Sequence, residues 1–280
     1  MKPAPFTYHA PATVAEAAAL LGEDAKVLAG GQSLVPAMNF RLARPATIVD
    51  INRIRSLDRI DVGAEIVTVG AMTRHRRFEE PIEPGPLGRL LAMAAHKIGH
   101  LPIRVRGTMG GSLAHADPAA EWCSIFRVLD GRLVATGPEG SRVIEASGFF
   151  DTVFTTAIRP DELIETIELP RLADSYRVGF AEFSRRAGDF ALVMAAVVLD
   201  MDGETVRTAR LVVGGAADVP IRLEACEAAL AGQSLTSDTI GEIADLAAES
   251  VTPLEDIHAS VEYRRDLIRA MTRRAMAGAT

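Results

Sequence analysis

Cysteine is scarce in this chain of 280 residues, which contains only Cys123 and Cys226. The two cysteines lie far apart in the sequence, so they predict neither a disulfide framework nor a Cys-x-x-Cys redox pair. Each is expected to be a small buried side chain. An iron–sulfur cluster takes about four cysteine ligands, and this chain therefore cannot hold such a cluster by itself.

Clusters of positive charge and long apolar runs are also missing. Lys and Arg total 30 against 37 Asp and Glu, a net charge of −7, and the basic residues do not gather into the patch that nucleic acid requires. The longest apolar run, Phe190 to Leu199, is too short for a membrane span, and the N-terminus has no apolar signal-peptide core. We expect a cytoplasmic protein with no nucleic-acid partner and no membrane span.

The common catalytic and nucleotide-binding motifs are absent as well. No Gly-x-Gly-x-x-Gly follows a strand and no Gly-Lys-Ser/Thr is present, which disfavours Rossmann and P-loop folds. No Gly-x-Ser-x-Gly elbow is present to make a nucleophile of a serine. His96 and His100 have the spacing of helical metal ligands, but Gly99 lies between them and no Glu accompanies them. We therefore expect no metal site.

Two glycine pairs stand out against this background, and a serine follows each pair within two residues. They are Ala29-Gly30-Gly31-Gln32-Ser33 and Thr108-Met109-Gly110-Gly111-Ser112. Glycine permits positive φ and lets consecutive amides approach a phosphate. A single such motif is more often a plain turn. Two of them, predicted as loops in different α/β units, favour a ligand that lies between the units.

Apolar residues follow helix-type spacing in some segments and strand-type spacing in others, and the order of these segments along the chain predicts an α+β protein. One α/β unit is expected over about residues 1–55 and a second over 56–172, with a linker near residues 171–178 and a C-terminal α+β domain over 173–280. Thr73 is expected to cap a helix. Further helices are predicted over 13–21, 87–98, 119–129, 222–230, 237–251 and 260–276, and a helix or a turn over 34–42. Strands are predicted over 25–28, 47–51, 66–71, 132–136, 142–144, 162–169, 180–184, 191–201 and 205–213.

Two polar segments near these elements are candidates for ligand contact. His115 to Glu121 places a His, an Asp and a Glu directly after the second glycine pair, where a metal, acid–base chemistry or hydrogen bonding to a ligand are open alternatives and the position favours ligand hydrogen bonding. Arg185 to Ala191 forms a turn that enters an apolar strand, with a charged hairpin tip as its plain alternative. Trp122, the only tryptophan, is expected in the core.

The motifs, taken in order, resemble the FAD-binding medium subunits of the molybdenum hydroxylases, the family of carbon monoxide and xanthine dehydrogenases. The likeness covers nearly the whole chain. It includes both glycine motifs, Arg41-Leu42-Ala43-x-Pro45, Val49-Asp50-Ile51, Val69-Gly70-Ala71-Met72-Thr73, Ile103-Arg104-x-x-Gly107, Asp117-Pro118, Arg185-Arg186-x-Gly188-Asp189-Phe190-Ala191 and Glu262-Tyr263-Arg264.

The resemblance implies a fold and a set of cofactor contacts. The fold is an FAD-binding domain of the vanillyl-alcohol oxidase/p-cresol methylhydroxylase type, residues 1–172, followed by a C-terminal domain with a three-stranded antiparallel sheet and a three-helix bundle. FAD would lie extended between the two subdomains. No catalytic residue and no metal ligand is implied, and the expected cofactor contacts are Ala29, Gly30, Gly31, Gln32, Ser33, Ile98, Thr108, Gly110, Gly111, Ser112, Asp117, Glu121 and Phe190.

The resemblance also implies a function. The chain would be the flavoprotein subunit of an oxidoreductase, passing electrons from a small [2Fe-2S] subunit through FAD to an external acceptor, beside a large molybdopterin subunit in a dimer of heterotrimers. Alternatives are a stand-alone FAD-dependent oxidoreductase and a cofactor-free assembly scaffold. Gln32, His115 and Glu121 differ from the His, Asn and Asp of carbon monoxide dehydrogenases, which weakens an assignment to carbon monoxide as substrate.

Overall fold

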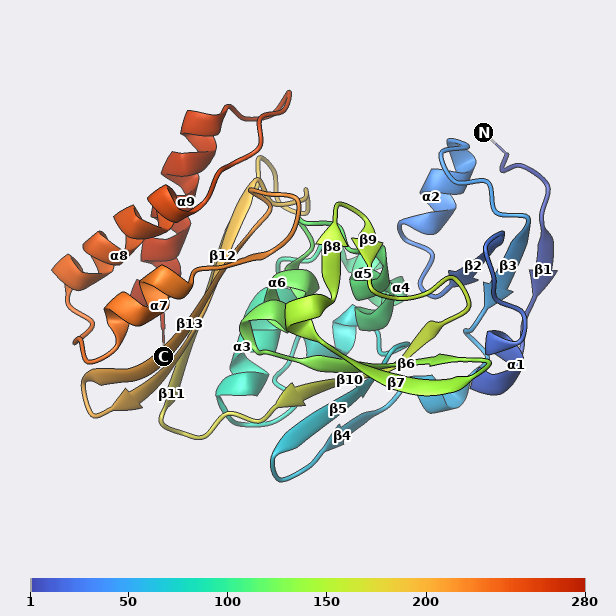
Figure 1. Ribbon diagram of the computed structural model, residues 1–280, viewed down its shortest axis with the longest axis horizontal. Helices are drawn as coiled ribbons and strands as arrows, with labels where there is room; N and C mark the ends of the chain where they lie inside the picture. The colour runs from blue at the N-terminus through green and yellow to red at the C-terminus, as the bar shows by residue number, and fades with distance from the viewer. Residues whose placement is uncertain (1, 280) are drawn as a thin grey trace.

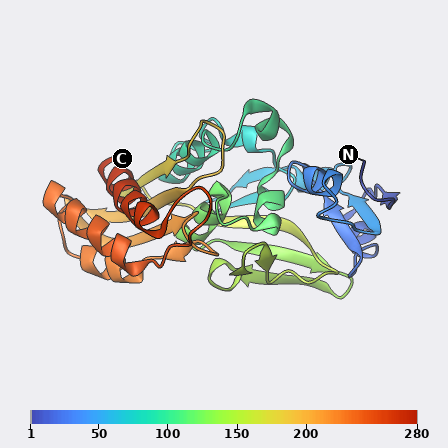
Figure 2. The same cartoon turned by 90° about the horizontal axis from the view of Figure 1, so that it is seen from above.

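The computed structural model describes residues 2–279. Three sheets of three or more strands lie in a row along the long axis, in chain order, and a further two-stranded sheet belongs to the middle unit (Figure 1). A small N-terminal sheet stands at one end, a five-stranded sheet with helices occupies the middle, and a four-stranded sheet backed by helices forms the other end. The view from above shows the same sequence of layers (Figure 2).

The N-terminal unit is a parallel sheet with two short helices. Thr13 caps the first helix, because its hydroxyl accepts from the amide of Glu16 at 3.2 Å while the Glu16 carboxylate accepts from the amide of Ala12 at 2.8 Å. This reciprocal cap confirms the helix start expected from the sequence. The strand order is β1-β3-β2, with bounds β1 Thr7–His9, α1 Val14–Ala18, β2 Ala25–Leu28, α2 Leu34–Asn39 and β3 Thr47–Asp50.

The middle unit is an antiparallel sheet in the order β4-β5-β10-β6-β7, with four helices in the chain between β5 and β6. Its apolar residues, including Trp122 and Phe126, form the largest core. The elements are η1 Arg55–Leu57, β4 Ile60–Val62, β5 Ile66–Gly70, η2 His75–Phe78, α3 Pro86–Ala95, α4 Leu101–Arg106, α5 Met109–His115, α6 Glu121–Val128, β6 Arg132–Gly137, β7 Gly140–Glu145, η3 Ala146–Gly148, β8 Phe150–Thr152, β9 Thr155–Thr156 and β10 Leu163–Pro170.

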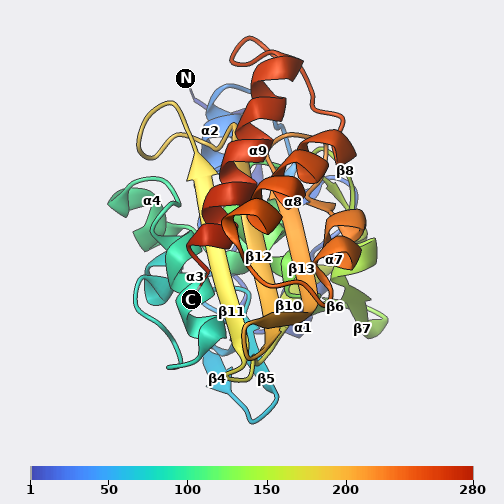
Figure 3. The ribbon, with the colours of Figure 1, turned by 90° about the vertical axis from the view of Figure 1, so that its left-hand side faces the viewer.

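The C-terminal sheet is covered on both faces. Helices α7, α8 and α9 lie on its outer face (Figure 3), and α3 and α6 of the middle unit contact the other face. Val193 to Met201 is buried throughout, which explains an apolar run without alternation. The elements are β11 Tyr176–Phe183, β12 Val193–Asp202, β13 Thr205–Gly214, β14 Ile221–Arg222, α7 Glu224–Leu230, α8 Ser237–Ser250 and α9 Val261–Ala277.

Several local expectations need correction. Thr73 caps no helix; its hydroxyl donates to the carbonyl of Arg59 at 3.0 Å, and Arg74 stands at the N-cap of the short 3-10 helix that follows. The linker is shorter than predicted, because Tyr176 already begins β11. The C-terminal sheet gains a fourth strand, the two-residue β14, which is too short to carry a periodic signal.

Among residues 2–279, no helix has the length and apolarity needed to cross a membrane.

Candidate cofactor site

The first glycine motif follows β2 and turns sharply into α2. Gly31 adopts a φ of +72°, in the left-handed region that favours glycine. A Cβ on Gly30 would lie 2.7 Å from the Cα of Gly107 and would also collide with the carbonyl of Arg106. The motif therefore crosses the α4–α5 junction at backbone contact distance, and Gly30 is required by protein packing.

The amides of this motif remain available. Within residues 2–279, no protein acceptor takes the amide protons of residues 30–33. The side chain of Gln32 donates to the carbonyl of Gly30 at 3.0 Å and so closes the turn from within. Ser33 stands at the N-cap of α2 without a side-chain capping bond. A row of unengaged amides on a fixed turn is the arrangement that binds a phosphate group.

The second glycine motif is the start of a helix and not the loop that we expected. Thr108 caps α5, since its hydroxyl accepts from the amide of Gly111 at 3.0 Å. Gly110 packs on the end of β5: its amide donates to the carbonyl of Ala71 at 3.0 Å, and a Cβ there would lie 2.7 Å from the Cα of Ala71. The amide of Gly110 is therefore already engaged within the protein.

The two glycine motifs lie side by side. A Cβ on Gly111 would stand 3.4 Å from the Cβ of Ala29 and 2.7 Å from the hydroxyl of Thr108. Ala29 belongs to the N-terminal unit and Gly111 to the middle unit, so the contact joins the two units. The next residue along α5, Ser112, is half-buried beside them.

Two residues that the sequence reasoning missed hold the first motif in place. Asn52 donates to the carbonyl of Ala29 at 2.8 Å, and Arg74 donates to the Asn52 side chain at 2.6 Å. Arg74 also donates to the carbonyl of Arg106. These bonds tie β3, the glycine turn and α4 together. Beside them lies a pocket of about 360 Å³, lined by Asn52, Ile54, Arg55, Asp58, Met72 and Arg74.

A buried histidine packs against the backbone that leads into the second motif. The indole nitrogen of Trp122 donates to Nδ1 of His75 at 2.9 Å, which places the imidazole proton on Nε2. Burial is the main cause that lowers the pKa of His75 to about 3, so the ring is neutral. Its other edge lies against Gly107, where a Cβ would be 2.6 Å from Cδ2 of the ring. His75 therefore fixes the backbone that enters α5.

The segment after α5 meets the C-terminal domain. The amide of Gly215 donates to the carbonyl of Pro118 at 2.8 Å. Asp117 accepts from the amide of Ala119 at 2.9 Å, which shapes the turn. The ring of His115 packs on Phe154 with 4.9 Å between centroids, and burial lowers the pKa of His115. His115 is thus a packed side chain of α5, although its segment lies at the domain junction.

The turn between β11 and β12 closes on the other side of the junction. Gly188 has a φ of +85°, and a Cβ there would lie 2.5 Å from Cε1 of His100 at the start of α4. Ile98, two residues earlier, is 7% exposed. Phe190, at the end of the same turn, is 61% exposed, so its ring is available to a flat ligand or to a partner protein.

Glu121 begins α6 and is 6% exposed. Burial raises the pKa of Glu121 to about 8, and the nearby carboxyl of Glu182 on β11 contributes to the rise. The sequence reasoning did not single out Glu182, because it stands in an ordinary strand pattern. The two residues lie far apart in the sequence, and only the packing of the C-terminal sheet on the middle unit brings the charge of Glu182 near Glu121.

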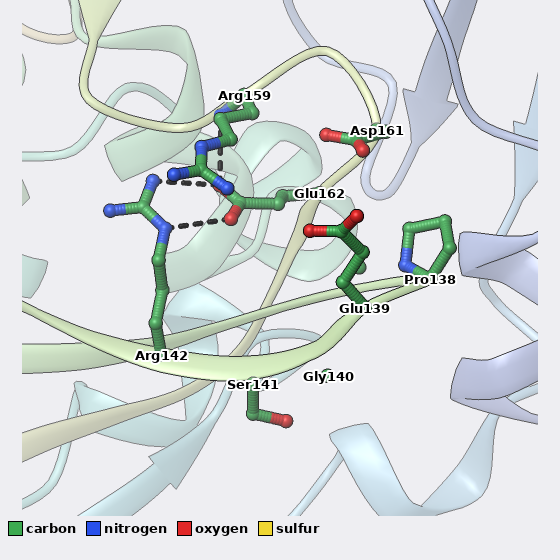
Figure 4. A pocket seen from close by; sticks show the side chains of 9 residues that line it. Pro138, Glu139, Gly140, Ser141, Arg142, Arg159, Asp161 and Glu162 are labelled. Carbon is green, nitrogen blue, oxygen red and sulfur yellow. Dashed lines mark hydrogen bonds and ion pairs between the residues drawn. The ribbon is translucent and has the colours of Figure 1, made fainter.

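A second pocket lies apart from all of these residues. It measures about 160 Å³ and opens at the β6–β7 turn (Figure 4). Arg142 forms an ion pair with Glu162 at 2.7 Å, and the amide of Arg159 donates to the same carboxylate at 2.9 Å. None of the expected cofactor contacts lines this pocket, so it is no part of the candidate site.

Two protein families match the chain end to end. The family described as "FAD binding domain in molybdopterin dehydrogenase" matches residues 4–172, and the family described as "CO dehydrogenase flavoprotein C-terminal domain" matches residues 179–279. The chain belongs to the FAD-binding flavoproteins of the molybdopterin dehydrogenases. FAD is the cofactor of this family, and the resemblance drawn from the sequence motifs is confirmed.

Similar proteins agree with this membership. The chain is 40% identical over 284 residues to the 6-hydroxypseudooxynicotine dehydrogenase complex subunit alpha of Paenarthrobacter nicotinovorans, a match that covers 100% of this chain and 96% of that one. It is 35% identical over 280 residues to the carbon monoxide dehydrogenase medium chain of Hydrogenophaga pseudoflava, covering 99% and 97%.

Solved structures show the same fold. A carbon monoxide dehydrogenase from Hydrogenophaga pseudoflava superposes with a TM-score of 0.95 at 37% identity, covering 100% of this chain and 98% of that one. Quinoline 2-oxidoreductase from Pseudomonas putida 86 superposes with a TM-score of 0.95 at 34% identity and the same coverage. The predicted α+β fold is therefore confirmed. The chain is the flavoprotein subunit of an oxidoreductase.

Proposed function

We propose that this flavoprotein carries FAD as the electron-transfer subunit of a multi-subunit molybdenum hydroxylase. Electrons would come from a partner [2Fe-2S] subunit and leave to an external acceptor. The names of its relatives, medium chain and complex subunit, support membership in such an assembly. The observation that carries the proposal is the contact between Ala29 and Gly111 beside the unengaged amides of residues 30–33.

The residues present fit the cofactor at its phosphate end. The amides of residues 30–33 would hold the pyrophosphate, and Gln32 would keep the turn closed by its bond to the carbonyl of Gly30. Thr108, Gly111 and Ser112 would form the facing wall. The engaged amide of Gly110 gives this residue a packing role in the same wall.

The domain junction fits the flavin end. Ile98, Asp117 and Glu121 come from the middle unit, and Phe190 comes from the C-terminal domain. An exposed aromatic ring at the end of a fixed turn is suited to cover a flavin ring. Bound FAD supplies the redox chemistry. The chain's own residues hold the cofactor, exclude water and leave an edge open toward the partner.

The cysteines bear on how the cofactors are divided among the subunits. Two buried cysteines cannot ligate a cluster, and Cys123 and Cys226 are both buried here. The iron–sulfur and molybdopterin cofactors would then belong to partner chains. The division into residues 1–172, with subdomains 1–55 and 56–172, and residues 173–280 remains our proposal, as do the dimer of heterotrimers and the cytoplasmic location.

The proposal is tested by purifying the full chain alone and together with its copurifying subunits. We expect the lone chain to show the absorption bands of oxidised flavin, with no flavin reduction on adding substrate. The assembled complex should reduce that flavin when substrate is added. Substrate-dependent reduction in the lone chain would support the stand-alone oxidoreductase instead, and a colourless folded chain would support the assembly scaffold.

A further inference from the structure

Glu182 faces the FAD-binding domain from the C-terminal sheet. On β11, Ala181 and Phe183 pack with the C-terminal helices, whereas Val178 and Phe180 pack into the core shared with α3 and α6. Successive side chains of a strand point to opposite faces, so Glu182 points toward α3 and α6. It is followed by the turn that carries Phe190.

The surroundings of Glu182 contain the proposed flavin contacts. One of its carboxylate oxygens, Oε2, is buried and has no hydrogen-bond partner in the described part of the chain. Its charged neighbours are Lys97, which directly precedes Ile98, and Glu121 at the start of α6. Asp117, from the turn before α6, adds a further negative charge near Glu121.

The two buried carboxyls interact with each other. Burial raises the pKa of Glu182 to about 7, against a smaller opposing effect of the Lys97 charge. Burial also raises the pKa of Glu121, and the charge of Glu182 raises it further. Among residues 2–279, the hydrogen bond that the Glu121 carboxylate accepts comes from its own backbone and no other residue donates to it. Burial with little hydrogen bonding disfavours the charged form of a carboxyl, and the charge of the neighbouring carboxyl adds to that effect, so ionisation of both groups together is disfavoured at neutral pH.

We propose that Glu121 and Glu182, two carboxyls at the proposed flavin site, together hold one proton and bind a second proton when the flavin is reduced. This inference rests on the proposed function. Reduction would take two electrons from one-electron donors of the iron–sulfur class and two protons from water, of which one would go to the flavin and the other to a carboxylate oxygen of the pair. On reoxidation the electrons pass to the acceptor and both protons return to water.

The physical reason is charge balance. Added negative charge on the cofactor favours the neutral form of a nearby carboxyl, because burial leaves little water to screen it. A pair that already holds one proton in an apolar setting can accept a second without a large rearrangement. The pair would therefore link the flavin potential to pH.

The test measures the midpoint potential of bound flavin against pH in the full chain loaded with FAD, between about pH 6 and about pH 8, where such raised carboxyl groups titrate. We expect Glu182→Gln and Glu121→Gln each to take up about one proton fewer per two electrons than the wild type. Glu204→Gln is the control, since Glu204 lies at the β12–β13 turn with its side chain 85% exposed.

The results separate this inference from the proposed function. An unchanged slope in both variants would overturn the inference while leaving FAD binding intact, whereas a wild-type chain without FAD would overturn the proposed function itself. Where a variant fails to bind FAD, the reduced-minus-oxidised infrared difference spectrum of the wild type serves instead. It should gain a protonated-carboxyl band, and the absence of that band would contradict the pair.

Discussion

Glycine serves distinct purposes at neighbouring positions of the proposed cofactor site. Gly31 supplies a left-handed backbone, Gly30 and Gly110 allow close backbone packing, and Gly111 faces Ala29 across the two units. Sequence reasoning treated these glycines alike, as positions where the backbone meets a ligand. The structure shows that Gly30 and Gly110 are required by protein packing, whereas Gly111 meets Thr108 and Ala29, where we propose that it borders the cofactor.

A branched side chain at Gly111 should prevent cofactor binding. In Gly111→Val the Cβ would press on the Thr108 hydroxyl and the added methyl groups on Ala29, which would move the two motifs apart. We expect FAD content to fall at least about tenfold, a loss of about 1.4 kcal/mol or more in binding free energy. The flavin-to-protein absorbance ratio measures it.

The matched control is Gly22→Val. A Cβ on Gly22 meets nothing within 4 Å, so this variant should keep its FAD. A folded Gly111→Val chain with normal flavin content would show that the position does not border the cofactor.

His75 should make the protein sensitive to acid. Its folded pKa of about 3 lies below its ordinary value of 6.5, so the unfolded chain binds a proton that the folded chain excludes. Stability is then present above about pH 6.5 and is lost as the pH falls toward 3. Between about pH 6.5 and pH 4.5 this loss amounts to about 2 kcal/mol.

Urea unfolding of the wild type and of His75→Gln at both pH values measures this contribution. The variant is less stable at neutral pH, but its free energy of unfolding should fall less on acidification. Equal pH dependence in the two proteins would show that His75 titrates normally in the folded state.

Sequence alone could predict those site residues that belong to a short, recognisable motif. The glycine motifs and the turn before Phe190 carry their signal within a few residues. The structure brings the two glycine motifs together and places the turn before Phe190 against His100 at the start of α4. Asn52, Arg74, His75 and Glu182 act only through segments far away in the sequence. No local pattern separates them from ordinary surface or strand residues, so the sequence could not predict them.

At the scale of elements, the start of α5 is the instructive case. Two glycines argue against a helix, since each costs about 1 kcal/mol relative to alanine. The Thr108 cap and the contact of Gly110 with Ala71 offset that cost. Long amphipathic helices such as α8 and α9 were predicted to within a few residues, because their periodic signal extends over several turns.

The cap of α5 provides a test at this scale. Thr108→Ala removes the bond to the amide of Gly111 and should cost about 1 kcal/mol of stability. Thr236→Ala removes the equivalent cap of α8, whose hydroxyl accepts from the amide of Thr239 at 3.1 Å. We expect a similar loss of stability in both variants, and weaker FAD binding in Thr108→Ala alone.

Thermal unfolding and FAD titration of the two cap variants separate these effects. Equal FAD affinity in both would mean that the cap of α5 serves only stability and contributes nothing to the cofactor site.

At the scale of the whole molecule, the middle unit and the C-terminal sheet share one core. Val178, Ala196, Val198 and Val212 of that sheet belong to the same apolar cluster as Trp122. The sequence predicted a linker and separate domains, and it could not reveal this shared core, because the contacts join residues far apart along the chain. The two parts should therefore lose their structure together.

Val198→Ala tests this coupling. Removing two buried methyl groups should lower the free energy of unfolding by roughly 2 kcal/mol. Trp122 fluorescence reports on the middle unit and far-UV circular dichroism on the whole chain, and the two transitions should stay coincident. Separate midpoints would show that the C-terminal domain unfolds independently.

The central claim is that the amides of residues 30–33 hold the pyrophosphate of FAD. Hydrogen exchange followed by mass spectrometry, with and without FAD, tests it most directly, because unengaged amides exchange quickly and phosphate-bound amides do not. We expect peptides that contain Gly30 to Ser33 to become strongly protected by FAD, while the Gly140 turn at β6–β7 is unaffected. Stoichiometric FAD binding without protection at residues 30–33 would contradict the account.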